Sequence, residues 1–424
     1  MARSMSVEEA RNLVLEPLSA LPAEEVAILE SFNRVLAKDV ASDIDVAPFD
    51  NSAMDGFAVR AADLAGATME APRSLEVVAH VAAGDDVAGI EIGPGQAARI
   101  MTGAPVPAGA DSVVMVECTQ VLADGTNSDT SGGIGSVVAF EIEPKLGEHI
   151  RHRGEEVMAG DTVMRAGEVL GPAGIGLLAA TGHSAVVVHR RPRVAIISTG
   201  SELVEIAEKP GPGKIRNSNS YSLAAQVVAV GGIPLRFPIV IDDPDAIREA
   251  FLRAAKESDF IVTSGGVSVG DFDYVRPVLE ELGELTFCKV MMRPGNPQTF
   301  GSIRGVPFFG LPGNPTSTYV GFEMFVRPAL RAMQGFSAAE QRPRTWARLA
   351  HDVKKKPDRR YYLRGVVERT ESGYEASVPC SQSSALLTAA HKGNCFVVLP
   401  EGERMFTTGT LVECVRLDME EGVS

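Results

Sequence analysis

The stretch Thr263-Ser-Gly-Gly-Val-Ser-Val-Gly-Asp-Phe-Asp-Tyr274 decides the fold of the surrounding chain. It directly follows the apolar run from Phe260 to Val262, and a second loop, Leu311-Pro-Gly-Asn-Pro-Thr-Ser317, directly follows the run from Pro307 to Gly310. In each case a predicted strand is followed by a glycine-containing loop and then by a predicted helix. Glycines at such a junction let backbone N–H groups approach a ligand, and the helix that follows favours negative charge. Both loops are therefore predicted to bind an anionic group.

Two carboxylates distinguish the first loop from a simple phosphate cradle. Asp271 and Asp273 would repel a bare phosphate unless a hard cation such as Mg²⁺ stood between the charges. A phosphate group bound together with Mg²⁺ is therefore the leading interpretation. The alternative is that the glycines only make tight turns at strand ends and that the aspartates cap the next helix.

The sequence around these loops alternates between short apolar strands and amphipathic helices. Such alternation is typical of a parallel sheet with helices on both faces, which binds its ligands outside the carboxyl ends of the strands. Both glycine loops fall at those ends. The expected strands cover residues 194–198, 235–240, 260–263, 285–290 and 307–309, and the expected helices cover residues 221–230, 244–256, 274–282 and 317–333.

Most of the remaining chain has a β-rich pattern. Short β-branched runs separated by Gly and Pro fill residues 74–121 and 137–169, and short strands resume after Gly335. The polar, glycine-rich stretch 124–135 is expected to form a flexible hairpin tip.

Two further helical pieces are expected near the N-terminus. Residues 6–21 have an apolar face, and Ser6 and Glu9 have the spacing of a capping box. Residues 30–41 form a second, short amphipathic pattern.

Composition narrows the class of protein. At 424 residues the chain is too long for a single core, which indicates roughly three or four domains. A net charge of −15 argues against nucleic acid or an anionic membrane as the partner. The five cysteines are scattered and odd in number, which favours reduced thiols over disulfides or a zinc site. No segment reaches the ~20 apolar residues of a membrane span and no secretory signal is present, so a cytoplasmic location is expected.

Five motifs occur in an order that resembles one known family. They are the two loops already quoted, Phe49-Asp-Asn-Ser-Ala-Met-Asp-Gly-Phe-Ala-Val59, Arg99-Ile-Met-Thr-Gly-Ala-Pro-Val-Pro107 and Ser198-Thr-Gly-Ser-Glu-Leu203. Together they resemble the molybdopterin molybdenumtransferase family, which includes MoeA of bacteria and the matching domain of animal gephyrin. The likeness runs from about Ser6 to Val415. It implies an enzyme that inserts molybdate into adenylylated molybdopterin with Mg²⁺-dependent release of AMP.

The resemblance also implies a domain organisation and partners. It predicts a homodimer, with molybdopterin adenylyltransferase and molybdoenzymes as further partners. Each subunit is expected to contain a three-layer molybdopterin-binding α/β domain with a parallel-type sheet, β-rich N-terminal domains and a small C-terminal β-barrel. The expected boundaries are a discontinuous linker and dimerisation domain at 6–50 and 147–190, an inserted β-rich domain at 51–146, the α/β domain at 191–335 and the barrel at 340–418.

Acidic positions of the family map onto residues of this chain. Glu202, Asp242 and Asp273 become candidates for catalysis and for Mg²⁺ binding, although a DDP helix start would explain Asp242 without any function. Asp55 and Thr102, with Asp50 nearby, are expected to reach the α/β domain of the partner subunit and complete its active site. The alternative for these residues is a carboxylate-rich turn.

Substrate-binding positions map in the same way. The basic residues Lys289, Arg293 and Arg364, together with Ser384, are expected to bind molybdate. The loop residues expected to bind the molybdopterin substrate are Gly265, Gly266, Ser268, Gly270, Asp271, Pro312, Gly313 and Asn314.

The chain departs from the family pattern beside Arg293. Many relatives read Lys-Pro-Gly-Lys-Pro where this chain reads Arg293-Pro-Gly-Asn-Pro297, so Asn296 removes one positive charge. Losing a charge-assisted contact weakens a dianion site by about 1.5 to 3 kcal/mol. The alternative function is therefore a divergent paralogue that carries or scaffolds the cofactor without efficient molybdate insertion.

Overall fold

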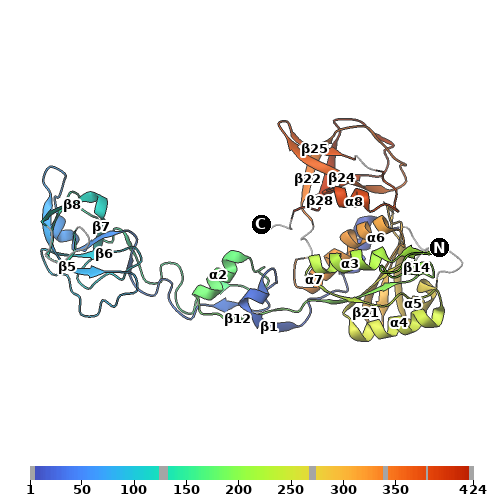
Figure 1. The fold of residues 1–424 in the computed structure, drawn as a ribbon, viewed down its shortest axis with the longest axis horizontal. Helices are drawn as coiled ribbons and strands as arrows, with labels where there is room; N and C mark the ends of the chain where they lie inside the picture. The colour runs from blue at the N-terminus through green and yellow to red at the C-terminus, as the bar shows by residue number, and fades with distance from the viewer. Residues whose placement is uncertain (1–4, 124–131, 267–273, 338–341, 379–380, 420–424) are drawn as a thin grey trace.

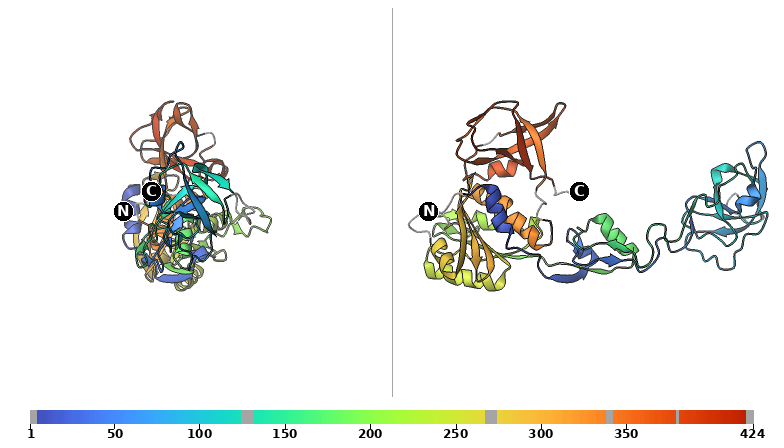
Figure 2. Two further views of the ribbon diagram at one scale, coloured as in Figure 1. Left: turned by 90° about the vertical axis from the view of Figure 1, so that its left-hand side faces the viewer. Right: turned by 180° about the vertical axis from the view of Figure 1, so that it is seen from behind.

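The computed structural model describes residues 5–123, 132–266, 274–337, 342–378 and 381–419. The chain is elongated (Figure 1), with a β-rich body at one end, a small middle part around α2 (Pro172–Ala180), and an α/β part beneath a β-barrel at the other end. The view from behind in Figure 2 shows the same separation. None of the helices in these described ranges is long and apolar enough to cross a membrane. The expected hairpin tip falls largely outside the described residues, as do Ser268, Gly270, Asp271 and Asp273.

A mixed sheet forms the centre of the α/β part. In spatial order its strands are β16 (Ile233–Arg236), β13 (Arg193–Ser198), β17 (Phe260–Ser264), β21 (Val306–Leu311), β20 (Pro297–Ile303) and β18 (Gly283–Lys289). The first four are parallel, whereas β20 runs antiparallel to both of its neighbours. The expected parallel-type sheet is confirmed, and the antiparallel strand β20, next to the edge strand β18, is an addition that the sequence did not predict. The sequence pattern missed β20 because this strand begins within the turn-rich run Arg293-Pro-Gly-Asn-Pro297.

Helices cover both faces of this sheet, as expected. Successive residues of a strand point to opposite faces. On one face Val194 and Ile196 pack with α3 (Ser218–Ala229) and α7 (Arg327–Met333). On the other face Ala195 and Ile197 pack with α4 (Pro244–Glu257) and α5 (Val275–Leu282). The three layers are visible in Figure 1. Because β16, β13, β17 and β21 are parallel, their carboxyl ends lie at the same edge of the sheet.

Two expected helices differ in extent from the prediction. The one at 317–333 is α6 (Pro315–Gly321), followed by a π-helical turn at Phe322–Val326 and then α7. The one at 6–21 is α1 (Val7–Leu15), capped as predicted by Ser6 and Glu9 and ending before Pro17. Glu16 keeps helical dihedral angles, but Pro17 has no backbone N–H with which to continue the hydrogen-bond ladder, which accounts for the early end. Apolar side chains of α1 join the same core as α7.

The β-rich body at the far end is a single six-stranded sheet. Its strands pack Phe57, Phe140 and neighbouring apolar side chains into a core of their own. In spatial order the strands are β7 (Ser112–Met115), β4 (Gly56–Val59), β6 (Gln96–Ile100), β5 (Arg73–Val81), β9 (Val137–Phe140) and β8 (Thr119–Ala123).

The middle part is built from α2 and the antiparallel pair β1 (Ala23–Ala27) and β12 (Ala185–His189). The helical piece expected at 30–41 was wrong. A 3₁₀ turn at Ile28–Ser31 precedes isolated bridges that Val35 and Leu36 make with Val169 and Val188. Pairing with these distant residues overrides the local helical pattern.

A two-stranded ribbon joins the middle part to the β-rich body. It contains β2 (Val40–Ala41) paired with β11 (Thr162–Met164), and β3 (Asn51–Ser52) paired with β10 (Ile150–Arg151). Between these pairs the backbone of Ser42 bonds to Gly160 and Asp161, and Val46 bonds to Val157. The outgoing and returning chains therefore stay together along the whole connection.

The C-terminal part is a closed barrel, as expected. The strands are β24 (Arg360–Thr370), β25 (Gly373–Ser377), β22 (Arg344–Leu349), β28 (Leu411–Arg416) and β26 (Cys395–Leu399), and pairing of β24 with β26 closes the ring. A short strand, β19 (Met292–Arg293), pairs with β24 and so ties the α/β part to the barrel.

Candidate active site

The two glycine loops lie side by side at the carboxyl ends of neighbouring strands. Gly265 and Gly266 directly follow β17, and Pro312, Gly313 and Asn314 directly follow β21. Gly265 has a φ of +98°, and a Cβ atom there would lie 2.5 Å from the carbonyl oxygen of Thr199. A larger residue would therefore force the loop away from the end of β13. Glycine is thus required here by the packing of the loop itself.

A cavity of about 540 Å³ opens beside these loops. The predicted residues Glu202, Gly313 and Asn314 all line it, and so does Ser264, the residue before Gly265. Its remaining walls come from β14 (Leu203–Val204), β15 (Ile215–Arg216) and the start of α3. The next two strands of the sheet along the chain, β16 and β17, lie on opposite sides of β13, and the cavity lies at the carboxyl end of β13. Open α/β sheets bind ligands at this kind of position.

Asp242 and Glu202 lie on adjacent loops at the end of β13. The Asp242 carboxylate accepts a 2.8 Å hydrogen bond from the backbone N–H of Ser201, the residue beside Glu202. The cap of α4 is Asp243, whose side chain accepts from the backbone N–H groups of Asp245 and Ala246. A helix start therefore explains Asp243 and leaves Asp242 without a capping role.

The side chains of Glu202 and Asp242 are of the chemical type that binds magnesium. Mg²⁺ usually takes one or two protein carboxylates and keeps several of its waters. The described residues contain no group of three or more His, Cys, Asp or Glu side chains placed to hold a metal. Asp273, the third predicted ligand, lies outside the described residues, so the structure places only Glu202 and Asp242, on adjacent loops.

A second cavity, of about 280 Å³, carries basic side chains. The predicted residues Arg293, Pro312, Asn314 and Ser384 line it, together with Asn296. Because Asn314 lines both this cavity and the 540 Å³ cavity, the two are neighbours. The backbone N–H of Thr316 donates to the Ser384 carbonyl at 3.0 Å, which holds the barrel loop over the start of α6.

A third cavity, of about 530 Å³, continues from the second and brings Arg364 beside Arg293. Arg364 is only 2% exposed, and its Nε atom has no hydrogen-bond partner in the described structure. Burial and the charge of Arg293 lower the pKa of Arg364 to about 10. Two guanidinium groups that repel each other in a partly buried site favour the binding of an anion between them.

The sequence reasoning missed several residues of these basic cavities. Lys356, Tyr361 and Gln382 line both of them, and Arg359 lines the smaller one, although Arg359 also pairs with Asp358. The run of basic residues from Lys354 to Arg360 was the available signal. Lys289, by contrast, pairs with Pro297 at the end of β18 and is absent from the described lining of both cavities.

Asp55 and Thr102 meet in the β-rich body. The backbone N–H and the hydroxyl of Thr102 donate to the same Asp55 carboxylate oxygen at 2.7 and 2.8 Å. These hydrogen bonds, first that of the backbone and then that of the hydroxyl, lower the pKa of Asp55. Asp50 accepts from the backbone N–H of Arg153 at 2.7 Å and lies near the ring of His152. Within one chain the β-rich body that carries this group lies at the opposite end of the molecule from the α/β part that contains Glu202 and Asp242 (Figures 1 and 2).

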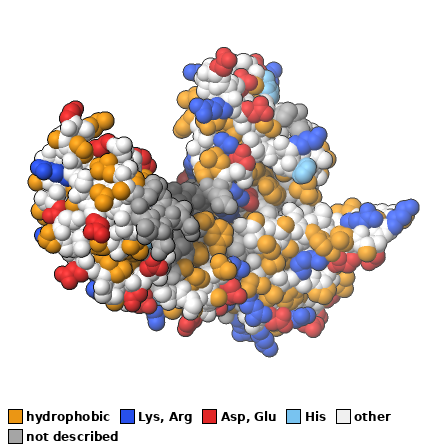
Figure 3. Space-filling model, turned by 60° about the vertical axis from the view of Figure 1, so that its left-hand side comes forward, with side chains coloured by type: hydrophobic (Ala, Val, Ile, Leu, Met, Phe, Trp, Pro, Cys, Tyr) orange, Lys and Arg blue, Asp and Glu red, His pale blue; other side chains and the backbone are white. Residues whose placement is uncertain are grey.

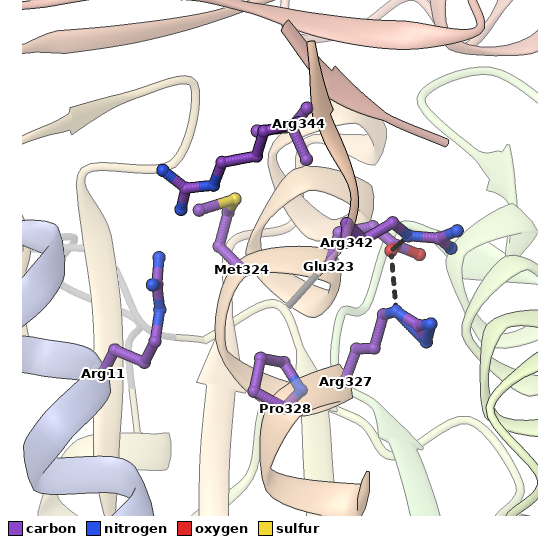
Figure 4. A pocket seen from close by; sticks show the side chains of 8 residues that line it. Arg11, Glu323, Met324, Arg327, Pro328, Arg342 and Arg344 are labelled. Carbon is purple, nitrogen blue, oxygen red and sulfur yellow. Dashed lines mark hydrogen bonds and ion pairs between the residues drawn. The ribbon is translucent and has the colours of Figure 1, made fainter. Parts of the chain in front are cut away.

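A small arginine-rich pocket lies where α1, the π-helical turn and α7 of the α/β part meet the start of the barrel. Figure 4 shows Glu323 of the π-helical turn facing Arg327 and Arg342, with Arg11 and Arg344 beyond it. The Glu323 carboxylate accepts from Arg342 at 2.9 Å and from Gln226 of α3 at 3.0 Å. The pocket has room for only about 20 Å³, which is too little for a cofactor precursor.

Fold and site together define a class of protein: a molybdenum cofactor biosynthesis protein with a MoeA architecture. Three family models match in order, described as the MoeA N-terminal region (domain I and II) at residues 5–182, a probable molybdopterin binding domain at 195–332 and the MoeA C-terminal region (domain IV) at 346–417. The chain belongs to the molybdopterin molybdenumtransferase family.

Similarity to individual relatives extends over nearly the whole chain. The molybdopterin molybdenumtransferase of Bacillus subtilis is 37% identical over 420 residues, which covers 98% of this chain and 95% of that protein. The Staphylococcus aureus protein of the same name is 37% identical and covers 96% of this chain and 94% of its own length. The crystal structure of the molybdopterin biosynthesis MoeA protein from Pyrococcus horikoshii OT3 has a TM-score of 0.81 at 29% identity, covering 98% of this chain and 100% of its own.

Proposed function

We propose that this protein inserts molybdate into adenylylated molybdopterin and releases AMP in a Mg²⁺-dependent reaction. The observation that carries the proposal is the shared wall at Asn314. It joins the cavity at the glycine loops to a cavity lined by Arg293, Lys356 and Arg359. One end of a long substrate can thus lie in the first cavity while a tetrahedral oxyanion lies in the second.

The glycine loops are suited to the phosphate end of the substrate. Gly313 and Asn314, in the loop after β21, line the 540 Å³ cavity beside Ser264 at the end of β17, and the helix that follows them favours an anion. Glu202 and Asp242, with Asp273, are the carboxylates that would hold Mg²⁺. When bound, Mg²⁺ would neutralise phosphate oxygens while the phosphoanhydride to AMP is hydrolysed.

The basic cavities are suited to molybdate. Arg293 and the buried Arg364 offer two guanidinium groups, and Ser384 lies at the edge of the same cavity as Arg293. Guanidinium groups bind a tetrahedral dianion with several directed hydrogen bonds. These side chains would hold the oxyanion near the dithiolene sulfur atoms while AMP leaves.

The active site would be completed by a second copy of the chain. Asp55 and Thr102 are already held together by two hydrogen bonds, yet they lie at the far end of the same chain. A homodimer in which the β-rich body of one subunit reaches the α/β part of the other would bring them to Glu202 and Asp242. Dimerisation would then be a requirement for catalysis.

The cellular setting of the proposal is the cytoplasm. The four described cysteines, Cys118, Cys288, Cys395 and Cys414, are free thiols, which suits a reducing compartment. Molybdopterin adenylyltransferase would supply the substrate, and molybdoenzymes would receive the product.

One experiment tests the proposal directly. Purified protein is supplied with adenylylated molybdopterin and Mg²⁺, and AMP and molybdenum cofactor are measured with and without molybdate. Both products should form only when molybdate and Mg²⁺ are present together. Tight substrate binding without AMP release in the complete mixture would refute the proposal.

A further inference from the structure

Four polar side-chain atoms around the 540 Å³ cavity have no hydrogen-bond partner in the described structure. They are Ser198 Oγ, Thr199 Oγ1, Asn217 Nδ2 and Asn219 Oδ1. All four residues line the cavity. Ser198 and Asn217 are each 1% exposed and Thr199 is 3% exposed. Buried polar groups are rarely left unpaired, so a cluster of them in a cavity wall indicates a ligand that pairs with them.

The orientation of both amides follows from their other hydrogen bonds. Asn217 is the N-cap of α3, and its Oδ1 atom accepts from the backbone N–H of Ser220 at 3.3 Å. A backbone N–H can only donate, so the unpaired atom of Asn217 is the Nδ2 donor. Asn219 Nδ2 donates to Ser264 Oγ at 2.7 Å and to the Gly313 carbonyl at 2.8 Å. A carbonyl can only accept, so the unpaired atom of Asn219 is the Oδ1 acceptor.

These roles restrict the chemistry of the ligand. A phosphate group offers only acceptors and would leave Asn219 Oδ1 unpaired, while a metal ion would be repelled by the Asn217 donor. A ligand edge with one donor beside one acceptor satisfies both amides, and the two hydroxyls can donate or accept. The apolar walls supplied by Leu203, Ile215 and Pro315 suit a flat ring.

Ile215 supports a ring on independent grounds. It pairs with Leu203 across β14 and β15, and it remains 56% exposed although it is a large apolar side chain. A flat ligand in the cavity would cover part of this surface. Apolar side chains above and below a heterocycle, with polar groups at its edge, are a common arrangement for reading a base.

We propose that Asn217 and Asn219 determine specificity by reading the amidine edge of a heterocycle, an exocyclic amino group beside a ring nitrogen. The amino group donates to Asn219 Oδ1, and the ring nitrogen accepts from Asn217 Nδ2. Both pterin and adenine carry this edge, so either end of the proposed substrate supplies the same chemistry. The identity of the ligand rests on the proposed function, whereas the hydrogen-bonding pattern rests on the geometry of the cavity.

Asn219 also connects the proposed heterocycle site to the two glycine loops. Its Nδ2 atom bridges Ser264, at the end of β17, and Gly313, in the loop after β21. A heterocycle bound to Asn219 Oδ1 would therefore hold the bridging amide in place. The same amide would thereby add to the backbone contact between Gly265 and Leu311 that holds the two glycine loops together.

The test uses bare heterocycles with the full-length protein. Pterin is compared with lumazine, and adenosine with inosine, by equilibrium binding. Deamination swaps both roles of the edge, because the amino donor becomes a carbonyl acceptor and the ring nitrogen gains a hydrogen. The aminated member of one pair should bind at least about tenfold more tightly. The pair that shows this preference identifies which end of the substrate the cavity takes.

Asn217→Asp provides the matched variant. Aspartate caps a helix as well as asparagine does, so α3 keeps its start while the cavity loses its donor. The variant should bind the preferred heterocycle about tenfold or more weakly and should discriminate less against the deaminated form. Asn33→Asp is the control, because it adds the same charge at an exposed position in the middle part of the chain. It should bind like the wild type.

The outcomes separate this inference from the proposed function. Equal affinity for both members of both pairs, or unchanged discrimination in Asn217→Asp, would overturn the inference even if AMP release is normal. Preserved discrimination in a protein that never releases AMP would support the inference and refute only the proposed reaction. Thr199→Val gives a further check, because loss of one unpaired hydroxyl should weaken binding of the same heterocycle without altering the fold.

Discussion

Arg364 lies buried beside Arg293, and burial first and then the charge of Arg293 lower the pKa of the Arg364 guanidinium to about 10. Both side chains line one cavity, and they come from different parts of the chain, the α/β part and the barrel. An unpaired charge in such a place destabilises the ligand-free protein, because burial removes its hydration and the neighbouring charge adds repulsion. The arrangement makes binding of an anion the step that relieves both effects.

Arg364→Gln tests whether this charge serves a ligand or the fold. The variant should need about ten- to hundredfold more molybdate for half-maximal insertion, because a charge-assisted contact is lost. Its ligand-free melting temperature should stay the same or rise. Saturating molybdate at about 100 times Kd should stabilise the wild type by about 2.7 kcal/mol and the variant much less. A lower melting temperature without any change in molybdate dependence would assign Arg364 a purely structural role.

Asn296→Lys tests the departure from the family pattern. Asn296 lines the 280 Å³ cavity, and its amide donates to the Val290 carbonyl at 2.6 Å. A lysine there should lower the molybdate concentration for half-maximal insertion, and the gain should shrink as salt rises because the added attraction is Coulombic. Gln120→Lys adds the same charge on the distant β8 and should leave the molybdate dependence unchanged. An unaltered or weaker dependence in Asn296→Lys would show that the missing charge does not limit binding.

Asp242 and Asp243 form a matched pair for testing the metal. Asp242→Asn should lower Mg²⁺-dependent AMP release at least about tenfold and raise the Mg²⁺ concentration required, because an amide is a poorer ligand for a hard cation. Asp243→Asn keeps the cap of α4, since asparagine caps helices well, and should behave like the wild type. If both variants lose activity equally, loop geometry rather than metal binding explains the effect.

The composite site predicts complementation between inactive subunits. Asp55→Ala and Asp242→Ala should each be inactive, yet subunit exchange should restore about a quarter of the wild-type activity, because half of the dimers gain one intact site. A mixture of Asp55→Ala with Thr102→Ala should stay inactive, since both changes lie in the same β-rich body. Recovery absent from the first mixture would place all of these residues in one subunit's site.

The pKa of Asp55 offers a pH-dependent test. The Thr102 backbone N–H and then its hydroxyl hold this pKa below the ordinary value. A lowered folded-state pKa means that the contact contributes stability above the unfolded value of about 3.9, and loses it as pH falls through the folded value. Thr102→Val removes the hydroxyl donor and keeps the backbone donor, so the pKa should rise part of the way. Carboxylate NMR titration would measure the shift, and an unchanged pKa would mean that the hydroxyl contributes nothing.

The sequence was sufficient wherever a local pattern decides the structure. Glycines between β17 and α5, and between β21 and α6, mark strand ends because few other residues fit there, and Glu202 follows such a turn. These features pointed to the edge of the sheet beside which the 540 Å³ cavity lies. The three-layer arrangement followed from alternating strands and helices in the same way.

The features that the sequence missed depend on contacts between distant residues. Asn217 and Asn219 acquire unpaired atoms only because Ser220, Ser264 and Gly313 occupy the other halves of their amides. Lys356 reaches Arg293 only because β19 pairs with β24 of the barrel. Neither arrangement leaves a periodicity or spacing in the sequence, because each forms only when distant segments meet in the folded chain.

The ribbon that carries the β-rich body has a mechanical consequence. Ser42 and Val46 are hydrogen-bonded to the returning chain, and the Asp45 carboxylate accepts from Arg153 and from the backbone N–H of Ala159. The two segments of the connection therefore bend together as one strip. The β-rich body lies at the far end of this ribbon and moves with it as a unit. A small rotation at the base of the strip would swing Asp55 through a large arc, so in the proposed homodimer residues with no catalytic chemistry would set how Asp55 meets the active site of the other subunit.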